Sequence, residues 1–181
     1  MQIISGKYKG RKLFLPPGAR PTQNRARIAL FNMLDNLPIT IHCAPLNIWD
    51  AFAGSGAFGI EFLSRFTNKS VIFTDINPES IKNIRKNLTG IDGNASVIQT
   101  NAVTASDKLG KIADIIFIDP PYANADMGTR LVAKLANIAK SGAVIVWEME
   151  SDGNHEIPHN MTVIKDKTYG RARFLILTTN H

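Results

Sequence analysis

The sequence predicts an α/β protein built around a parallel, doubly wound sheet. From residue 46 onward, short apolar runs alternate with segments of helical periodicity, the pattern of repeated strand–helix units. The run Ala113–Asp119 (ADIIFID) is almost continuously apolar, as expected for a strand buried on both faces. Asp50, Asp75 and Asp119 each stand at the carboxyl end of a predicted strand, so we expect the site at that edge of the sheet.

The remaining elements follow from local patterns. The first 15 residues alternate around two glycines and predict a β-hairpin, and after prolines at 16 and 17 a helix is expected from Thr22 to about Leu34. The expected strands are Leu46–Asp50, Val71–Asp75, Ser96–Thr100, Ala113–Asp119, Ala143–Glu148, Met161–Asp166 and Ala172–Thr178. Further helices are expected from the glycine-rich turn to about Phe66, from Pro78 toward Leu88, and over roughly Met127–Ala139. The last two strands predict an antiparallel hairpin turning at Tyr169-Gly170, and the predicted units are a hairpin extension (1–18) and a main domain (19–181).

Composition narrows the class of protein. A length of 181 residues with 44% hydrophobic and 20% charged residues fits an ordinary globular chain. No apolar run approaches the roughly 18 residues of a membrane span, and the N-terminus lacks the apolar core of a signal peptide, so a cytoplasmic protein is expected. Cys43 is the only cysteine, and the four histidines show no metal-ligand spacing, so no metal site is expected.

The net charge of +6 is concentrated at one end of the chain. Residues 1–34 contain seven Lys and Arg and no acidic residue, whereas the other 147 residues carry 14 basic and 15 acidic residues. This asymmetry favours a polyanionic partner such as a nucleic acid, and a solvated basic arm is the alternative. The candidate contacts are Lys7, Lys9, Arg11, Lys12, Arg20, Arg25 and Arg27.

The segment DAFAGSGAFG, which begins at Asp50, matches the pattern G-x-G-x-x-G. Asp50 would repel a diphosphate but pair with the ammonium of a methionine moiety, which favours S-adenosylmethionine over a dinucleotide. Asp75, 21 residues after Gly54, could bind ribose hydroxyls in either cofactor, and we expect Ile76 on the adenine face and Asn101 near the adenine amino group. The candidate cofactor contacts are Asp50, Phe52, Gly54, Ser55, Gly56, Asp75, Ile76, Asn101 and Ala102.

The motif Asp119-Pro120-Pro121-Tyr122 follows the buried apolar strand directly. An exocyclic amine of a base is a poor nucleophile because its lone pair is conjugated into the ring. Asp119 and the Pro120 carbonyl could accept its two N–H bonds and turn the lone pair toward a methyl donor, while the prolines fix a rigid turn. Tyr122 offers a ring on which an extruded base could stack. The motif therefore indicates methylation of an amino group; the alternative is a proline-rich strand exit with a surface tyrosine.

The glycine-rich loop combined with Asp-Pro-Pro-Tyr resembles Rossmann-like amino-group methyltransferases. The segment RPTQNRARIALFN, which begins at Arg20, is similar to the R-P-T-x-x-R-x-R-x-x-L-F-N segment of bacterial 16S ribosomal RNA guanine-N2 methyltransferases of the RsmD type. The segments IISGKYKGRKL and FAGSGA match that family in the same order, so the resemblance covers nearly the whole chain.

This resemblance implies a monomeric, seven-stranded methyltransferase fold with an N-terminal hairpin that helps engage RNA. It also implies S-adenosylmethionine as cofactor and 16S ribosomal RNA, within an assembled or assembling 30S subunit, as partner. By position, Asp75 would be the ribose ligand, and Asp119 to Tyr122 would hold the target base. Asn24, Ile28 and Asn101 depart from acidic residues common in the family, which puts the first helix's role in cofactor closure and the adenine contact in doubt.

Other functions stay open at this point. An amino-methyltransferase acting on DNA adenine or cytosine, or on protein glutamine, would use the same chemistry on another substrate. An NAD-dependent oxidoreductase would explain the glycine pattern, but it leaves the Asp-Pro-Pro-Tyr turn without a role. A catalytically silent RNA-binding protein would use the basic segment alone.

Overall fold

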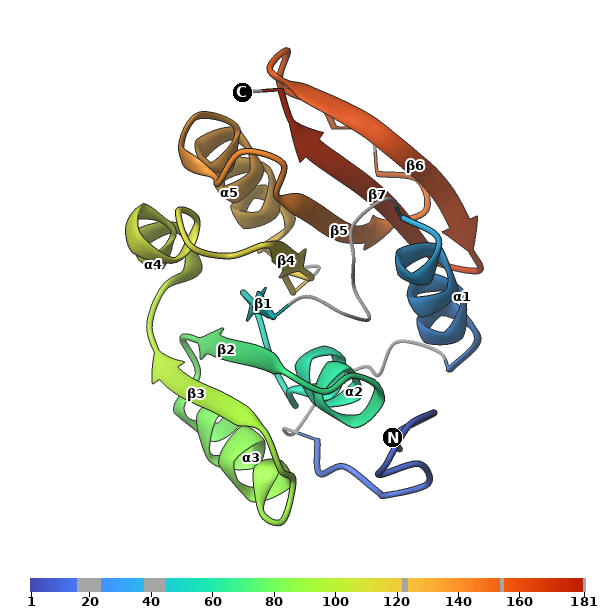
Figure 1. Ribbon diagram of the computed structural model, residues 1–181. Coiled ribbons are helices and arrows are strands. Elements are labelled where there is room, and N and C mark those ends of the chain that lie inside the picture. Colours follow the sequence, from blue (N-terminus) through green and yellow to red (C-terminus); the bar gives the residue numbers. More distant parts are fainter. Residues whose placement is uncertain (16–23, 38–44, 122–123, 154, 181) are drawn as a thin grey trace.

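The computed structural model describes residues 1–15, 24–37, 45–121, 124–153 and 155–180 (Figure 1). Within them, helices and strands follow the alternating order of an α/β protein. The helices are α1 Asn24–Asp35, α2 Ala57–Arg65, α3 Pro78–Leu88, α4 Ala102–Leu109 and α5 Ala125–Ile138. The strands are β1 Leu46–Asp50, β2 Lys69–Asp75, β3 Asn94–Gln99, β4 Ile115–Ile118, β5 Val144–Glu150, β6 Met161–Tyr169 and β7 Ala172–Thr179.

In the described part of the chain, seven strands form one sheet in the order β3-β2-β1-β4-β5-β7-β6. Neighbours among β1 to β5 pair in parallel, and β7 lies antiparallel between β5 and β6. The predicted α/β class, the seven-stranded sheet and the terminal antiparallel hairpin are thereby confirmed. The strand order changes direction between β1 and β4, and ligands of doubly wound sheets bind beyond the carboxyl ends of the strands at such a point.

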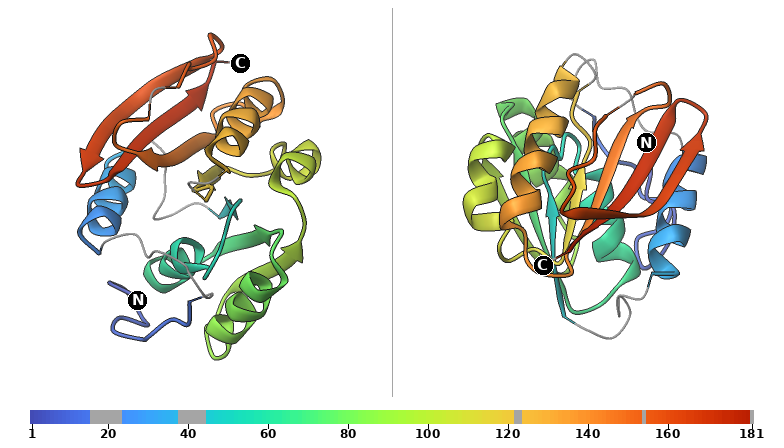
Figure 2. Two further views of the ribbon diagram at one scale, coloured as in Figure 1. Left: turned by 180° about the vertical axis from the view of Figure 1, so that it is seen from behind. Right: turned by 90° about the horizontal axis from the view of Figure 1, so that it is seen from above.

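Helices cover both faces of the sheet (Figures 1 and 2). α1, α2 and α3 pack on one face, and α4 and α5 pack on the other. On the first face, the rings of Phe31, Phe58 and Phe62 lie 5.2 to 5.5 Å apart, and Phe58 stacks on Phe117 of β4 at 3.9 Å. These contacts fix α1 and α2 against the centre of the sheet.

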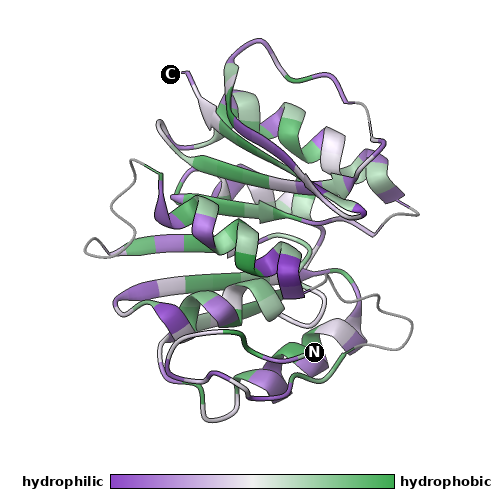
Figure 3. Cartoon of the chain, turned by 90° about the vertical axis from the view of Figure 1, so that its right-hand side faces the viewer, coloured by the Kyte–Doolittle hydropathy of each residue, from purple (hydrophilic) through white to green (hydrophobic). Residues whose placement is uncertain are grey.

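The buried part of the sheet explains why its strands were predictable. All four residues of β4 are buried, as the continuous apolar run predicted, whereas the edge strand β3 is mostly exposed. In Figure 3 the hydrophobic colour follows the central strands, and hydrophilic segments gather on helix surfaces and turns. The predicted site therefore lies at the end of strands that are buried in the centre of the molecule.

The N-terminal segment, residues 1–15, folds back on itself as the predicted hairpin, although its two arms do not form full strands. Among its described residues a single bridge joins Gln2 to Lys12, and turns occupy the middle. Gly6 has a φ of 81°, and a Cβ there would lie 1.9 Å from the Ser64 carbonyl oxygen, so the segment presses tightly on the end of α2. The predicted unit boundary at residue 18 lies outside the described residues.

Helix α4 was not predicted from the sequence. It is short, and only Ala102, Ser106 and Leu109 are buried, so its apolar stripe is weak. Its start is set by Asn101, whose side-chain oxygen accepts hydrogen bonds from Val103 N–H (2.9 Å) and Thr104 N–H (3.3 Å). This cap gives Asn101 a structural role at the carboxyl edge of the sheet.

Candidate active site

Three carboxylates meet at the carboxyl edge of the sheet. Asp50 and Asp75 end β1 and β2, and Asp119 directly follows β4. Burial raises the pKa of Asp50 to about 7, the hydrogen bond from Gly59 N–H opposes this shift, and the charges of Asp119 and Asp75 add to it. The structure thus brings Asp75 and Asp119 within electrostatic range of Asp50.

Two of these carboxylates hold the glycine-rich loop between them. Asp50 accepts a hydrogen bond from Gly59 N–H at 3.1 Å, and Asp75 accepts one from Gly54 N–H at 2.8 Å. Gly54 has a φ of 54° and Gly56 a φ of 76°, values that favour glycine. Asp50 is 1% exposed and lies behind the loop, so its direct contact with a ligand stays a prediction.

Gly59, the third glycine of the motif, has a packing role. A Cβ at this position would lie 2.3 Å from the ring of Phe73 on β2, so α2 approaches the sheet closely only because the residue is glycine. The G-x-G-x-x-G match therefore combines two loop glycines with one helix–sheet contact. Of the two loop glycines, Gly54 has open space around it, whereas Gly56 is buried and a Cβ there would lie 3.3 Å from the ring of Phe73.

The other predicted cofactor residues lie along the same edge with different exposures. Ile76 is 65% exposed, an uncommon state for a large aliphatic side chain, and Asp75 beside it is half-buried. Phe52 is half-buried, Ser55 is buried, and Ala102 at the start of α4 is 3% exposed. The oxygen of Asn101 is engaged in the α4 cap, so its amide N–H₂ is the group left to meet a ligand.

The Asp-Pro-Pro turn leaves β4 at the same edge. Burial raises the pKa of Asp119 to about 7. Pro120 is buried and Pro121 exposed, and the Pro121 carbonyl accepts a hydrogen bond from Asn124 N–H at 2.7 Å. The Pro121 carbonyl is therefore occupied by a hydrogen bond within the protein. The role of the Pro120 carbonyl as an acceptor for a base stays a prediction. Tyr122 lies outside the described residues.

A cavity of about 210 Å³ opens beside this turn. Pro120, Trp147, Glu148 and His155 are among the residues that line it. The rings of Trp147 and His155 lie 4.7 Å apart, and a Cβ on Gly128 of α5 would lie 2.8 Å from the Trp147 indole nitrogen. Glu148 ends the predicted strand Ala143–Glu148 and was not among the expected site residues, yet it is only 3% exposed, as its place after the apolar run VIVW could have indicated.

Comparison with known proteins supports an enzymatic site. The family model described as "Conserved hypothetical protein 95" matches residues 1–178. The relative named "Ribosomal RNA small subunit methyltransferase D" from Escherichia coli K12 is 31% identical over 179 residues, which cover 96% of this chain and 87% of that protein. The chain belongs to this methyltransferase D family.

Other members and solved structures agree with this assignment. The methyltransferase D protein of Buchnera aphidicola (Acyrthosiphon pisum) is 35% identical, covering 91% of this chain and 86% of its own. The solved structure of a putative methyltransferase from E. coli superposes with a TM-score of 0.82 at 29% identity, covering 99% and 97% of the two chains. The family membership contradicts the oxidoreductase alternative, since these relatives are named methyltransferases.

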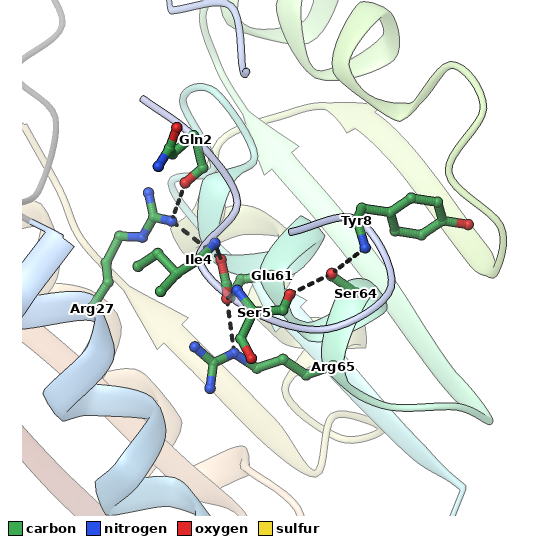
Figure 4. Close-up of polar contacts among 8 residues, drawn as sticks. All are labelled: Gln2, Ile4, Ser5, Tyr8, Arg27, Glu61, Ser64 and Arg65. Atoms are coloured by element: carbon green, nitrogen blue, oxygen red, sulfur yellow. Dashed lines mark hydrogen bonds and ion pairs between the residues drawn. The ribbon is translucent and has the colours of Figure 1, made fainter. Parts of the chain in front are cut away.

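In this methyltransferase, Arg27 corrects the prediction of an RNA contact. Its guanidinium is buried, and Nη2 donates to the Gln2 carbonyl at 2.7 Å and to Glu61 at 3.2 Å (Figure 4). Burial lowers the pKa of Arg27, and the Glu61 charge opposes that shift. Arg27 therefore holds the protein together and cannot reach a bound RNA in this conformation.

Glu61 of α2 is the centre of this network (Figure 4). Its carboxylate accepts hydrogen bonds from Ile4 N–H and Ser5 N–H, both at 2.9 Å, and from Arg65 Nε at 2.8 Å. A fully buried carboxylate with two guanidinium partners and two backbone donors is well satisfied. The network fastens the N-terminal segment of this methyltransferase to α1 and α2.

The remaining predicted RNA contacts differ in their partners. Lys9, Lys12 and Arg25 are exposed, and Lys7 is exposed but pairs with Asp92. Arg11 donates to the carbonyls of Asn87 and Thr89 at the end of α3, so it docks the segment there. Arg20 lies outside the described residues.

In the part of this methyltransferase that the structure describes, no helix is long and apolar enough to cross a membrane.

Proposed function

We propose that the protein transfers a methyl group from S-adenosylmethionine to the exocyclic N2 amine of a guanine in small-subunit ribosomal RNA. The observation that carries this proposal is the Asp119-Pro-Pro turn at the end of buried β4, beside the loop held by Asp50 and Asp75. The relatives' names support an RNA substrate. We also propose that the protein acts as a monomer and that its substrate RNA is part of an assembled or assembling 30S subunit.

The residues at the sheet edge fit this cofactor. Three mutually interacting carboxylates favour a ligand with positive charge and oppose a diphosphate. S-adenosylmethionine has a sulfonium, an ammonium and no phosphate, and when bound it supplies an electrophilic methyl group. Asp75 would accept hydrogen bonds from the ribose, Ile76 would cover the adenine face, and the Asn101 amide would donate to a ring nitrogen rather than accept from the amino group.

Asp119 holds the guanine amine that accepts the methyl group. Its carboxylate accepts one N–H of the guanine amine and the Pro120 carbonyl accepts the other, which turns the lone pair toward the methyl carbon. Holding nitrogen and methyl in line supplies much of the rate, about 7–11 kcal/mol in well-oriented systems. The nitrogen then loses a proton to solvent. Because Asp119 must be ionised to accept strongly, the adjacent positive cofactor favours its active form.

The N-terminal segment and α3 together provide a surface for the RNA, which we call the α3 surface: Lys12, Phe14, Lys82, Arg85 and Lys86. Phe14 is 51% exposed, and Lys86 Nζ lies 3.5 Å from the centre of its ring. Cations with an exposed ring suit phosphates and an unstacked base. Arg85 and Lys86 were not singled out from the sequence.

Asn87 fixes this surface beside the cofactor loop. Its side-chain oxygen accepts from Phe14 N–H at 2.8 Å, and its N–H₂ donates to the carbonyls of Phe14 and Ser55, both at 2.9 Å. Asn87 is 1% exposed, so these bonds are shielded from water. An RNA bound on the α3 surface would therefore adjoin the glycine-rich loop.

The acceptor class is tested by offering labelled S-adenosylmethionine with each of four acceptors: undermethylated 30S subunits, naked 16S rRNA, unmethylated DNA and an RNA-free protein extract. We expect label in the RNA of the 30S subunits, whether or not naked 16S rRNA is also labelled. Label in DNA or protein but in neither RNA would overturn the substrate and support the DNA or glutamine alternative.

A further inference from the structure

Selecting guanine requires more than an acceptor for its amine. Guanine presents a donor at N1 beside its N2 amine, whereas the ring nitrogen beside the amine of adenine is an acceptor. Asp119 and the Pro120 carbonyl would bind any planar amine. A second acceptor, placed beside the first, would be needed to bind the N1–H of guanine.

Glu148 stands in the position for such an acceptor. The paired register of β4 and β5 ends at Ile118 and Trp147, and Asp119 and Glu148 are the next residues on the two strands. Neighbouring strands are about 4.8 Å apart, so two side chains at this place can reach one edge of one base. Because Ile118 and Trp147 share the α5 face, Asp119 and Glu148 share the opposite face, and Glu148 is 3% exposed there.

Glu148 lies near a buried cation. Trp147 packs toward Gly128 of α5, so Glu148, the next residue of the strand, points to the opposite face, where α1 lies. There it lies within electrostatic range of Arg27, whose Nε and Nη1 are buried without a hydrogen-bond partner among the described residues. The two opposite charges attract each other, so Arg27 is a counter-charge for Glu148 on this face of the sheet.

We propose that Glu148 accepts the N1–H of the target guanine while Asp119 accepts an N2–H, and that Glu148 thereby selects guanine over adenine. The inference rests on the proposed function and names the residue that determines its specificity. If Glu148 were only a counter-ion of Arg27, its replacement would change stability and leave base selection as it is.

The test uses 30S subunits reconstituted with 16S rRNA that carries either guanine or 2-aminopurine at the methylated position. 2-Aminopurine keeps the 2-amino group but has an acceptor at N1. We expect the wild-type kcat/KM on guanine to exceed that on 2-aminopurine by about 10- to 100-fold, the usual effect of a charged hydrogen bond. In Glu148→Gln the ratio should fall to about 1, because an amide can donate to one base and accept from the other.

Two further variants separate specificity from folding. Glu148→Asp keeps a carboxylate and should retain the guanine preference at a reduced rate. Glu150→Gln changes an exposed carboxylate two residues along the same strand and should retain the wild-type ratio. A Glu148→Gln enzyme with the wild-type guanine to 2-aminopurine ratio overturns the inference and leaves the proposed function standing. A wild-type enzyme that methylates no RNA overturns both.

Discussion

At the level of one residue, Asp119 illustrates why we propose a positively charged ligand for this site. Its pKa is raised by burial to about 7, and its charge in turn helps raise the pKa of Asp50. Two such carboxylates near one another are unfavourable when ionised in the free protein. A cationic cofactor would relieve this repulsion, which supports the proposed S-adenosylmethionine.

The Asp119 carboxyl should therefore reduce stability at high pH. Its folded-state pKa of about 7 lies above its ordinary value of 3.8, so its stabilising contribution is complete below about pH 4 and is lost as the pH rises through about 7. Asp119→Asn, which cannot ionise, should match the wild type near pH 4 and exceed its free energy of unfolding by roughly 1–3 kcal/mol at pH 8. Urea unfolding of the cofactor-free protein across this range measures the difference. A variant less stable than wild type at pH 8 would contradict the raised pKa.

At the level of elements, α3 links the substrate surface to the cofactor loop. Its exposed side carries Arg85 and Lys86, its end receives Arg11, and its buried Asn87 joins Phe14 to Ser55. Helix α4, by contrast, lies on the other face of the sheet. It offers surface lysines for a matched comparison.

The double variant Arg85→Ala/Lys86→Ala should weaken RNA binding, because it removes two cations that neutralise phosphates. We expect the salt dependence of binding, d log K/d log [salt], to become shallower by about 1 for each phosphate that is no longer neutralised. Lys108→Ala/Lys111→Ala, at the exposed end of α4 and just beyond it, should bind RNA as the wild type does. Filter binding at several salt concentrations measures both. If the two double variants show the same salt dependence of binding, α3 is not part of the RNA-binding surface.

The sequence predicted the elements best where burial alone decides them. β1 and α3 have the predicted bounds, because an apolar run and a first-turn proline mark them clearly. The N-terminal hairpin has less strand pairing than alternating residues suggested: Gln2 pairs with Lys12, but the backbone N–H groups of Ile4 and Ser5 bind Glu61 instead of the opposite arm. Such a contact joins residues more than 50 positions apart, which no local pattern records.

The same limit applies to the site. Asp50, Asp75 and Asp119 could be placed together because strand ends of a parallel sheet share an edge. The burial of Arg27 could not be predicted, because its partner Glu61 is 34 residues away and charge alone suggested an RNA contact. Glu148 was not singled out from the sequence for the same reason, since its neighbours β4 and α1 are distant in sequence.

On the scale of the whole molecule, charge is divided between two regions. The exposed Lys9 and Lys12 of the N-terminal segment and the exposed cations of α3 lie on one side, and Asp50, Asp75 and Asp119 meet at the carboxyl edge of the sheet. Figure 1 shows the N-terminal segment beside α2 and α3. This arrangement suits an enzyme that holds a polyanion on its surface and a cation at its catalytic edge.

The most direct measurement is methyl transfer from labelled S-adenosylmethionine to undermethylated 30S subunits, followed by digestion and identification of the labelled nucleoside. Asp119→Ala is assayed alongside, with its fold checked by circular dichroism. We predict label in N2-methylguanosine with the wild type and at least an approximately 100-fold lower rate with the variant, which lacks the acceptor for the amine. Label in another nucleoside, or a variant as active as the wild type, would contradict the account.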